Sequence, residues 1–416
     1  MIGAALLAAA CSREGPDIVE LEFWAMGREG EIVPILTKEF EAENPDVRLR
    51  VQQIPWTVAH EKLLTAFVGG ALPDVAQLGN TWIAELAALG ALADLTGAVA
   101  GSVAIDEADY FSGIWATNVL HGAVLGVPWY VDTRLLFYRS DILKDAGFDH
   151  PPRDWAEWRA AAEAVKKRVG AGRFALLLPL NEFEPQVMLA LQQNDPVLRE
   201  DGRYGNFSSA GQRRAIDYYL SFFRDGLAPP ATESEIANVW NEFARGYFAF
   251  YITGPWNIGE FRRRLPADLQ DDWMTAPLPG PAGPGVSIAG GSSLVVVKKS
   301  KHQEAAFRLI EFLSRPDIQA RFYALSGNLP PRRSSWNDPL LKEDPYVGAF
   351  RDQLERVRPA PQIPEWERIA QEIRVVTERA VHEGWDAART AAELDRRVDA
   401  ILEKRRFMLA KAEETP

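Results

Sequence analysis

In the first ninety positions, segments with a helix-like spacing of hydrophobic residues alternate with short strand-like runs. Apolar side chains recur every three to four residues in three segments, which predicts amphipathic helices over residues 31–43, 59–68 and 82–89. Short apolar or alternating runs precede these segments, which predicts strands over residues 18–24, 47–51 and 74–78. Strands that alternate with helices predict a largely parallel α/β sheet, with ligands bound at the carboxyl ends of its strands.

Residues 126–138 combine two strand-like pieces with a polar interruption. Aromatic and β-branched residues flank Asp132, Thr133 and Arg134, which a buried strand has no reason to tolerate. This break predicts a hinge between two lobes. Tyr130 and Asp132 are two residues apart, so both are expected on one strand face, pointing into the gap between the lobes. A ring beside a carboxylate suits a sugar, and the alternative is an edge strand that carries a solvated pair of Asp132 with Arg134.

The rest of the chain continues as helices and strands. Helices are predicted over residues 140–146, 154–168, 186–193, 209–224, 303–313 and 316–325. Strands are predicted over residues 174–180, 247–252 and 294–297. A connector rich in Pro and Gly covers residues 277–285, and a turn over residues 254–256 is expected to present the ring of Trp256. The tail from Ile363 is predicted to be helical, with one long helix from Asp386 to about Met408.

Composition bounds the number of domains and the kind of partner. The length of 416 residues exceeds the roughly 250–300 at which a single core stops growing, which predicts two domains. Hydrophobic residues make up 47% of the chain, enough for a core in each domain. The net charge of −12, from 46 basic and 58 acidic residues, argues against nucleic acid as a partner. The 13 Trp residues offer flat apolar faces with a hydrogen-bonding edge, and a few of them are candidate stacking platforms.

The only cysteine, Cys11, ends an apolar run that begins at Met1. The run is too short to span a membrane and is typical of an export signal. The position of Cys11 resembles a bacterial lipobox, in which the Cys becomes the lipidated N-terminus. The sequence departs from that pattern at Ala8, where Leu is commoner, and in the lack of a basic residue before the run; the alternative is a plain secretory signal. Residues 12–17 suit a tether, and no later apolar run approaches ~18 residues.

Several short motifs occur in an order that resembles the bacterial extracellular solute-binding proteins of family 1, the maltose- and trehalose-binding type. The motifs are Phe23-Trp24, Leu72-Pro73-Asp74-Val75, Gly126-Val127-Pro128 leading to Asp132 and Tyr138, Gly246 with Gly254-Pro255-Trp256, Gly290-Gly291-Ser292, and Leu329-Pro330-Pro331-Arg332. The resemblance covers nearly the whole chain. It implies an α/β, two-lobed periplasmic-binding-protein-like fold (type II), with the ligand cleft between the lobes and several hinge crossings.

The resemblance also implies a division of the chain. Residues 1–17 would form the signal, lipobox and tether. The N-lobe would consist of residues 18–131 with about 290–335, and the C-lobe of residues 132–289 with about 336–416. Hinge crossings are expected near residues 131–134, 285–291 and 333–339.

Ligand contacts follow from the resemblance position by position. They are Trp24, Glu29, Glu31, His60, Asn80, Tyr130, Asp132, Glu184, Trp256, Gly291, Ser292 and Arg333, with Arg332 as an alternative to Arg333. Asp132 would accept hydrogen bonds from sugar hydroxyls, Trp256 would stack on a pyranose ring, and Gly291 would let the backbone approach the ligand. Trp24 and Trp256 could instead be core residues, His60 and Glu184 could be surface residues, and the two glutamates near residue 30 could stabilise a helix N-terminus.

The function implied by the resemblance is the substrate-binding component of an ABC sugar importer. The ligand would be a neutral α-glucosyl disaccharide, trehalose or maltose, and the partners would be the permease subunits in the inner membrane. The protein is expected to be a monomer, lipid-anchored through Cys11 in the periplasm or at the cell surface, with no cofactor, metal or catalytic residue. The alternatives are a glycosidase-like enzyme, for which Glu31 and Asp132 are available carboxylates, and a sugar-sensing lipoprotein without transport.

Overall fold

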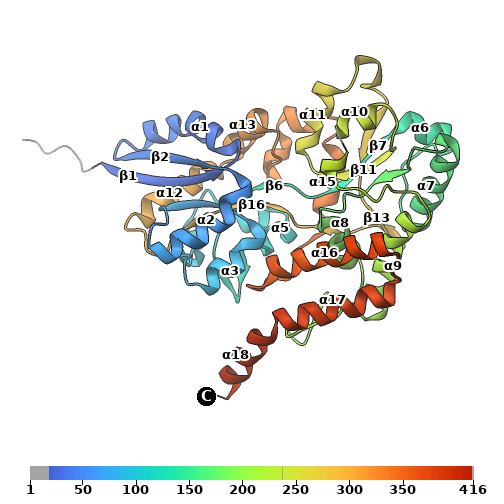
Figure 1. Ribbon diagram of the computed structural model, residues 1–416. Helices are drawn as coiled ribbons and strands as arrows, with labels where there is room; N and C mark the ends of the chain where they lie inside the picture. Colours follow the sequence, from blue (N-terminus) through green and yellow to red (C-terminus); the bar gives the residue numbers. More distant parts are fainter. Residues whose placement is uncertain (1–17, 237, 415–416) are drawn as a thin grey trace, which may run out of the picture.

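A computed structural model describes residues 18–236 and 238–414, whose two largest sheets lie side by side, each covered by helices (Figure 1). The predicted export signal and the predicted lipidation site at Cys11 lie outside the described residues. Within those residues, no helix combines the length and the apolar character needed to cross a membrane.

The first sheet has five strands in the order β2-β1-β3-β16-β6. Its strands are β1 (Val19–Met26), β2 (Val47–Ile54), β3 (Val75–Gly79), β6 (Val127–Val131) and β16 (Gly291–Val296). Strand β1 runs parallel to β2 and β3, whereas β16 runs antiparallel to β3 and β6. Because β6 is antiparallel to β16, it points in the same direction as β1, β2 and β3, so the sheet is largely parallel as predicted and β16 alone is reversed. The reason is that β16 returns from the second sheet rather than through a crossover helix on the first.

Helices cover both faces of this sheet because side chains of β1 alternate between two apolar clusters. Leu21 and Phe23 belong to one cluster, and Trp24 and Met26 belong to the other. The first cluster includes residues of α1 (Glu29–Glu43), α12 (Gln303–Leu313) and α13 (Pro316–Ser326). The second includes residues of α2 (Trp56–Gly69) and α3 (Ile83–Ala88).

The second sheet has four strands in the order β12-β7-β11-β8. They are β7 (Leu135–Arg139), β8 (Leu176–Leu177), β11 (Phe250–Thr253) and β12 (Trp273–Ala276). Leu136 and Tyr138 face α7 (Trp155–Val169), α8 (Glu184–Leu191), α9 (Ala210–Arg224), α16 (Trp366–Glu383) and α17 (Ala387–Ile401). Leu135 and Phe137 face α10 (Val239–Ala244), α11 (Trp256–Arg264) and α15 (Gly348–Leu354). One strand therefore supplies the cores on both sides of its sheet.

Three segments that link the two sheets run next to one another. The amide of Val131 donates to the carbonyl of Leu329 over 2.9 Å, and the amide of Asp132 donates to the carbonyl of Gly290 over 3.2 Å. The hydroxyl of Thr133 donates to the carbonyl of Ile288 over 2.8 Å. The lobe boundaries stay a prediction. Val131 ends a strand of the first sheet and Leu135 begins a strand of the second, which is compatible with a boundary between them.

Three local predictions are wrong. The strand predicted over residues 174–180 is only Leu176–Leu177, because the preceding amides at 174 and 175 donate to the loop carbonyls of Tyr247 and Leu227. The turn predicted at residues 254–256 is instead the start of α11, with Pro255 at its N-terminal cap. The long C-terminal helix is two helices, α17 and α18 (Glu403–Glu413), which part at the buried Leu402. Leu402 anchors the end of α17 in the core, whereas α18 buries none of its residues and projects from the body (Figure 1).

Candidate functional site

A cavity of about 210 Å³ lies where the carboxyl edge of the first sheet meets the second sheet. Four predicted ligand contacts line it, namely Asn80, Asp132, Glu184 and Gly291. Nine further residues complete the lining, namely Trp56, Gly79, Thr81, Trp82, Arg134, Phe183, Ile288, Gly290 and Glu367. Residues more than 300 positions apart in the chain thus share one cavity.

The floor of the cavity is the backbone at Gly290 and Gly291 together with the carboxylate of Asp132. A Cβ built on Gly290 would lie 2.1 Å from Oδ1 of Asp132, and Gly291 has a φ of +140°, which L side chains rarely adopt. Burial raises the pKa of Asp132, the nearby Arg134 opposes that rise, and Glu184 adds to it. No side-chain or backbone donor among the described residues makes a hydrogen bond that shifts this carboxyl. The group can therefore accept hydrogen bonds from a ligand.

Three other predicted contacts lie behind the floor rather than on it. Tyr130 is buried in the core of the first sheet, and Nε2 of Gln77 donates to its hydroxyl and to that of Ser292, over 3.2 Å in each case. Burial raises the pKa of Tyr130 well above its ordinary value, so the phenol stays neutral. Glu29 is buried in the first turn of α1 and accepts a hydrogen bond of 2.7 Å from Nδ2 of Asn328. The expectation that Tyr130 and Asp132 face the gap together is met only by Asp132.

The wall on the side of the second sheet contains one cation among several acids. Nη2 of Arg134 lies 2.7 Å from Oε1 of Glu184 and 3.9 Å from Oε2 of Glu182. The guanidinium carbon also lies 4.4 Å from the ring centroid of Trp256. Burial raises the pKa of Glu182 to about 7, while Arg134 acts in the opposite direction. Trp256 is 39% exposed and is not among the residues that line the cavity.

An aromatic rim closes the cavity on the side of the first sheet. The rings of Trp56 and Trp82 meet edge to face with centroids 5.7 Å apart, and the ring of His60 lies 5.1 Å from Trp82. Nε2 of His60 is 2.7 Å from Oε2 of Glu85. His60 therefore supports the rim from behind and does not line the cavity itself.

Sequence reasoning missed Trp56, Trp82, Arg134 and Glu367. Trp82 follows the predicted contact Asn80 by two residues, and Arg134 belongs to the polar interruption that defined the hinge, so both had a local signal. Glu367 had none, because α16 reaches the cavity from the far end of the chain. Burial raises the pKa of Glu367, a hydrogen bond with Thr81 lowers it, and one of its carboxylate oxygens is buried without a partner among the described residues.

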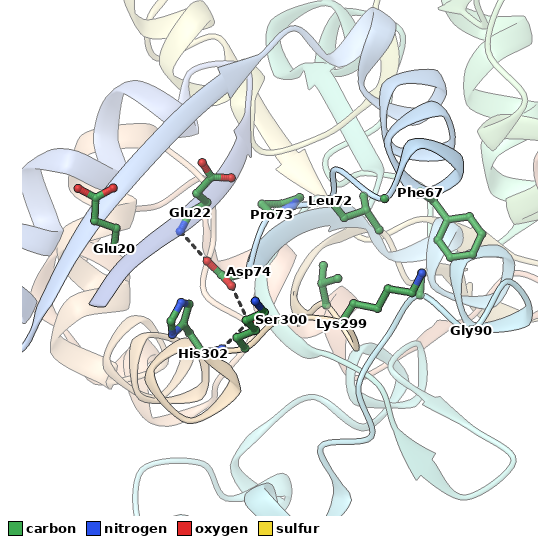
Figure 2. A pocket seen from close by; sticks show the side chains of 14 residues that line it. Glu20, Glu22, Phe67, Leu72, Pro73, Asp74, Gly90, Lys299, Ser300 and His302 are labelled. Atoms are coloured by element: carbon green, nitrogen blue, oxygen red, sulfur yellow. Dashed lines mark hydrogen bonds between the residues drawn. The ribbon is translucent and has the colours of Figure 1, made fainter. Parts of the chain in front are cut away.

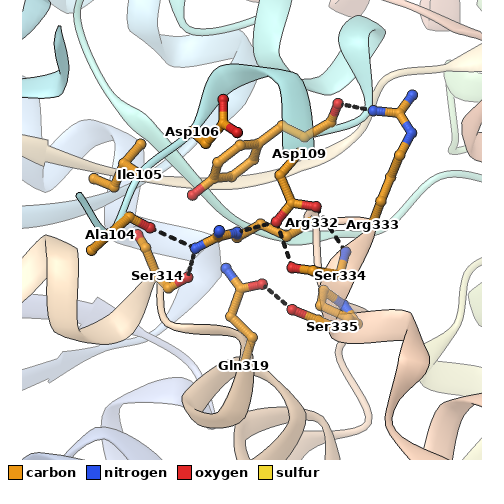
Figure 3. Close-up of polar contacts among 12 residues, drawn as sticks. Ala104, Ile105, Asp106, Asp109, Ser314, Gln319, Arg332, Arg333, Ser334 and Ser335 are labelled. Carbon is orange, nitrogen blue, oxygen red and sulfur yellow. Dashed lines mark hydrogen bonds and ion pairs between the residues drawn. The ribbon is translucent and has the colours of Figure 1, made fainter. Parts of the chain in front are cut away.

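Three predicted contacts lie away from the cavity. Trp24 is a core residue with Nζ of Lys62 4.6 Å from its ring, and Glu31 accepts a hydrogen bond of 3.1 Å from Gln53. Arg333 donates to Glu355 over 2.8 Å. It also donates to the carbonyl of Tyr110, which is the contact drawn at Arg333 in Figure 3. Since its guanidinium is already paired, the structure does not place Arg333 at the cavity.

The alternative to Arg333, Arg332, is buried in a structural network (Figure 3). Its guanidinium donates over 2.7 Å to Oδ2 of Asp109 and, also over 2.7 Å, to the carbonyls of Ala104 and Ser314. The hydroxyl of Ser334 donates to the same carboxylate. Arg332 therefore fastens the segment after Leu329 to Asp109 and Ala104, Arg333 pairs with Glu355, and neither arginine lines the cavity.

Another cavity, of about 340 Å³, lies at the opposite edge of the first sheet (Figure 2). None of the predicted ligand contacts lines it. Asp74 accepts hydrogen bonds there from the amide of Glu22 over 2.9 Å and from the hydroxyl of Ser300 over 2.5 Å. The aspartate of the Leu-Pro-Asp motif thus joins β1 and β3 to the turn after β16, which is a structural role.

The cavity between the sheets suits recognition of a polyhydroxylated ligand. The carboxylates of Asp132 and Glu184 can accept hydrogen bonds from the hydroxyl groups of a ligand, and Arg134 can donate hydrogen bonds to those hydroxyl groups. The indoles of Trp56 and Trp82 offer apolar faces. Among residues 18–236 and 238–414, no group of three His, Cys, Asp or Glu side chains could hold a metal ion.

Comparisons with known proteins agree with this geometry. The family model for the bacterial extracellular solute-binding protein matches residues 27–320. The solved structure of the sugar-binding protein MalE from Xanthomonas citri superposes with a TM-score of 0.92 at 52% sequence identity, covering 94% of this chain and 99% of that chain. This likeness extends over both sheets, so the fold is the two-lobed fold of periplasmic sugar-binding proteins.

Curated relatives are more distant. An uncharacterised lipoprotein of Streptomyces antibioticus is 29% identical over 386 residues, which cover 87% of this chain and 83% of the relative. The diacetylchitobiose-binding protein DasA of Streptomyces coelicolor is 25% identical over 338 residues, covering 80% of this chain and 77% of the relative. The family and these structural neighbours are solute-binding proteins and not enzymes.

Proposed function

Because the chain belongs to the bacterial extracellular solute-binding protein family, we propose that it is the sugar-binding component of an ABC importer. We further propose that its ligand is a neutral α-glucosyl disaccharide, with trehalose and maltose as the first candidates. The likeness to the sugar-binding protein MalE supports a sugar as the ligand class. The choice of disaccharide rests on the resemblance to the maltose- and trehalose-binding type.

The observation that carries the proposal is the Asp132 carboxylate on the glycine floor of the cavity. The carboxylate is half-buried, lines the cavity, and receives no hydrogen bond from the described residues that shifts its pKa. A carboxylate that no protein donor satisfies is free to accept hydrogen bonds from the hydroxyl groups of a ligand. Sugar hydroxyls supply the matching donors without adding charge.

Cleft closure is the second part of the proposal. The cavity of about 210 Å³ is small for a disaccharide site, since ligand pockets usually measure about 300–1,000 Å³. The proposed hinges are the three crossings near residues 131–134, 285–291 and 333–339, about which the lobes would open to admit the sugar and close over it. We propose residues 18–131 with about 290–335 as one moving body and residues 132–289 with about 336–416 as the other.

Export follows from family membership, and the anchor is proposed. Cys11 would carry the lipid, which is supported by the lipoprotein among the relatives. The permease subunits would accept the sugar from a monomeric binding protein. A sugar sensor without transport would need the same cleft, and a functional test of uptake separates the two.

The experiment is isothermal titration calorimetry of the purified mature chain with trehalose and with maltose. We expect saturable binding of at least one sugar and no release of glucose during prolonged incubation. Glucose release would favour the glycosidase alternative, whereas binding of an amino acid or a metal in place of either sugar would overturn the proposal.

A further inference from the structure

Arg134 stands between the cavity and the indole of Trp256. Arg134 lines the cavity, and Trp256 does not. The guanidinium carbon lies 4.4 Å from the centroid of the Trp256 ring, within the range of a cation–π contact. A ligand in the cavity would therefore meet the guanidinium first.

The guanidinium is held in place from two sides. Nη2 of Arg134 pairs with Oε1 of Glu184 at 2.7 Å, and Oε2 of Glu182 lies 3.9 Å from the same nitrogen. On the far side, the Trp256 ring is seated so closely against Gly254 that a side chain on this glycine would overlap it. The Arg134 side chain is only 12% exposed, so few other orientations are open to it.

The hydrogen-bonding capacity of Arg134 is not used up by these contacts. Its Nε is buried and has no hydrogen-bond partner among the described residues. A buried donor without a partner costs stability, and it is satisfied when a ligand oxygen reaches it. Two adjacent guanidinium N–H groups can engage neighbouring oxygens at once, and a sugar presents neighbouring hydroxyl oxygens.

We propose that Arg134 is a ligand-contacting residue of the cleft and that Trp256 is a positioning residue behind it. The guanidinium donates to two oxygens of the sugar, Glu184 fixes its in-plane orientation, and the indole supports its face. This inference rests on the proposed function, because it names a contact within the same sugar site. It departs from the expectation that Trp256 itself stacks on the pyranose ring.

The competing arrangement predicts effects of opposite sign. If the sugar stacked directly on Trp256, Arg134 would have to leave the ring first, and its removal would leave affinity unchanged or increase it. If Arg134 is the contact, its removal weakens binding, and Trp256→Phe has little effect because a phenyl ring still supports a guanidinium.

The test compares Arg134→Met, Arg134→Lys and Trp256→Phe with the parent by calorimetry with trehalose and with maltose. Arg134→Met keeps an apolar side chain against the indole but removes the donors, and we expect affinity to fall by about ten- to a hundredfold. Arg134→Lys keeps the charge without the planar fork, so an intermediate loss is expected. Trp256→Phe should stay within about threefold of the parent.

A matched control is available on the same lobe. Arg264 lies with its guanidinium carbon 4.2 Å from the ring of Trp240 and pairs with Glu260 at 2.5 Å, but it does not line the cavity. Arg264→Met removes the same kind of stacked and paired arginine, and sugar affinity should not change.

Monodeoxy analogues of the bound sugar separate contact from scaffold. For the parent, affinity should fall most clearly for the monodeoxy analogue that lacks the hydroxyl in contact with Arg134. In Arg134→Met and Arg134→Lys, removing that same hydroxyl should lower affinity by less than it does in the parent, because the arginine that met the hydroxyl is gone. If Arg134 were purely structural, removing the hydroxyl would lower affinity by the same factor in the parent and in the variants.

The outcomes are distinct. A parent that binds neither sugar overturns the proposed function, and this inference with it. A parent that binds sugar, together with an Arg134→Met variant of equal or higher affinity, overturns only the role of Arg134. An unchanged deoxy penalty in both arginine variants overturns it as well.

Discussion

Replacing Gly290 with Ala should weaken sugar binding while leaving the ligand-free protein folded. The new Cβ would lie 2.1 Å from Oδ1 and 3.3 Å from Cγ of Asp132, whereas real Cβ atoms essentially never come within 3.0 Å of a non-bonded heavy atom. The carboxylate oxygen must therefore retreat by about 1 Å. The overlapping atom is the end of a side chain and Gly290 has no positive φ, so the backbone can stay as it is.

The displacement is large compared with the tolerance of a hydrogen bond. A ligand hydroxyl at about 2.7 Å from the carboxylate would be left beyond the reach of a good hydrogen bond. A hydrogen bond to a charged group contributes about 1.5–3 kcal/mol, so affinity should fall by about ten- to a hundredfold. The rotation of Asp132 should cost the fold no more than about 1 kcal/mol.

Calorimetry with trehalose and maltose measures the first effect, and thermal unfolding without sugar measures the second. Gly97→Ala in α4 (Thr96–Gly101) is the control, because a Cβ there meets nothing within 4 Å. A Gly290→Ala protein that binds sugar like the parent would refute the role given to the Asp132 carboxylate. A protein that loses affinity only in proportion to a large loss of melting temperature would refute the local argument.

Three further predictions concern the same site. Asp132→Ala should lower sugar affinity by about ten- to a hundredfold and barely change the stability of the empty protein; normal binding with a lower melting temperature would make Asp132 a scaffold residue. Burial raises the folded-state pKa of Glu182 from its ordinary 4.5 to about 7, so the folded protein keeps a proton that the unfolded chain releases. The stability that this group contributes is therefore fully present below pH 4.5 and is lost as pH rises through 7, by up to about 3 kcal/mol. Glu182→Gln should remove that loss. Equal melting curves of parent and variant at pH 8 would contradict this expectation. Saturating sugar should reduce the radius of gyration in solution scattering, and an unchanged value would argue against lobe closure.

Local patterns of the sequence determine much of the architecture. The alternation of β7 is an example, because Leu135 and Phe137 must face one side and Leu136 and Tyr138 the other, whatever lies there. The polar interruption after Val131 is another, since a buried strand cannot carry three polar residues. These patterns predicted the helices, most strands, a crossing at Asp132 and, together with the family motifs, the two-lobed fold.

Local patterns do not say which distant segment becomes a neighbour. The antiparallel course of β16 follows from where the chain returns from the second sheet, and no period in residues 291–296 encodes that direction. The same limit applies to the predicted long C-terminal helix, because helix-forming residues continue past Leu402 while the core that anchors α17 ends there.

The site shows the same division. Asp132, Asn80 and Gly291 were identifiable from motifs and strand ends, Glu184 was named only through the family resemblance, and all four line the cavity. The pairing of Arg134 with Glu184 and its stacking on Trp256 join three segments of the chain that only packing of the second sheet brings together. Sequence periodicity determines which face of an element is apolar, whereas contacts between elements depend on the sum of packing over the whole molecule, and the cleft is made of such contacts.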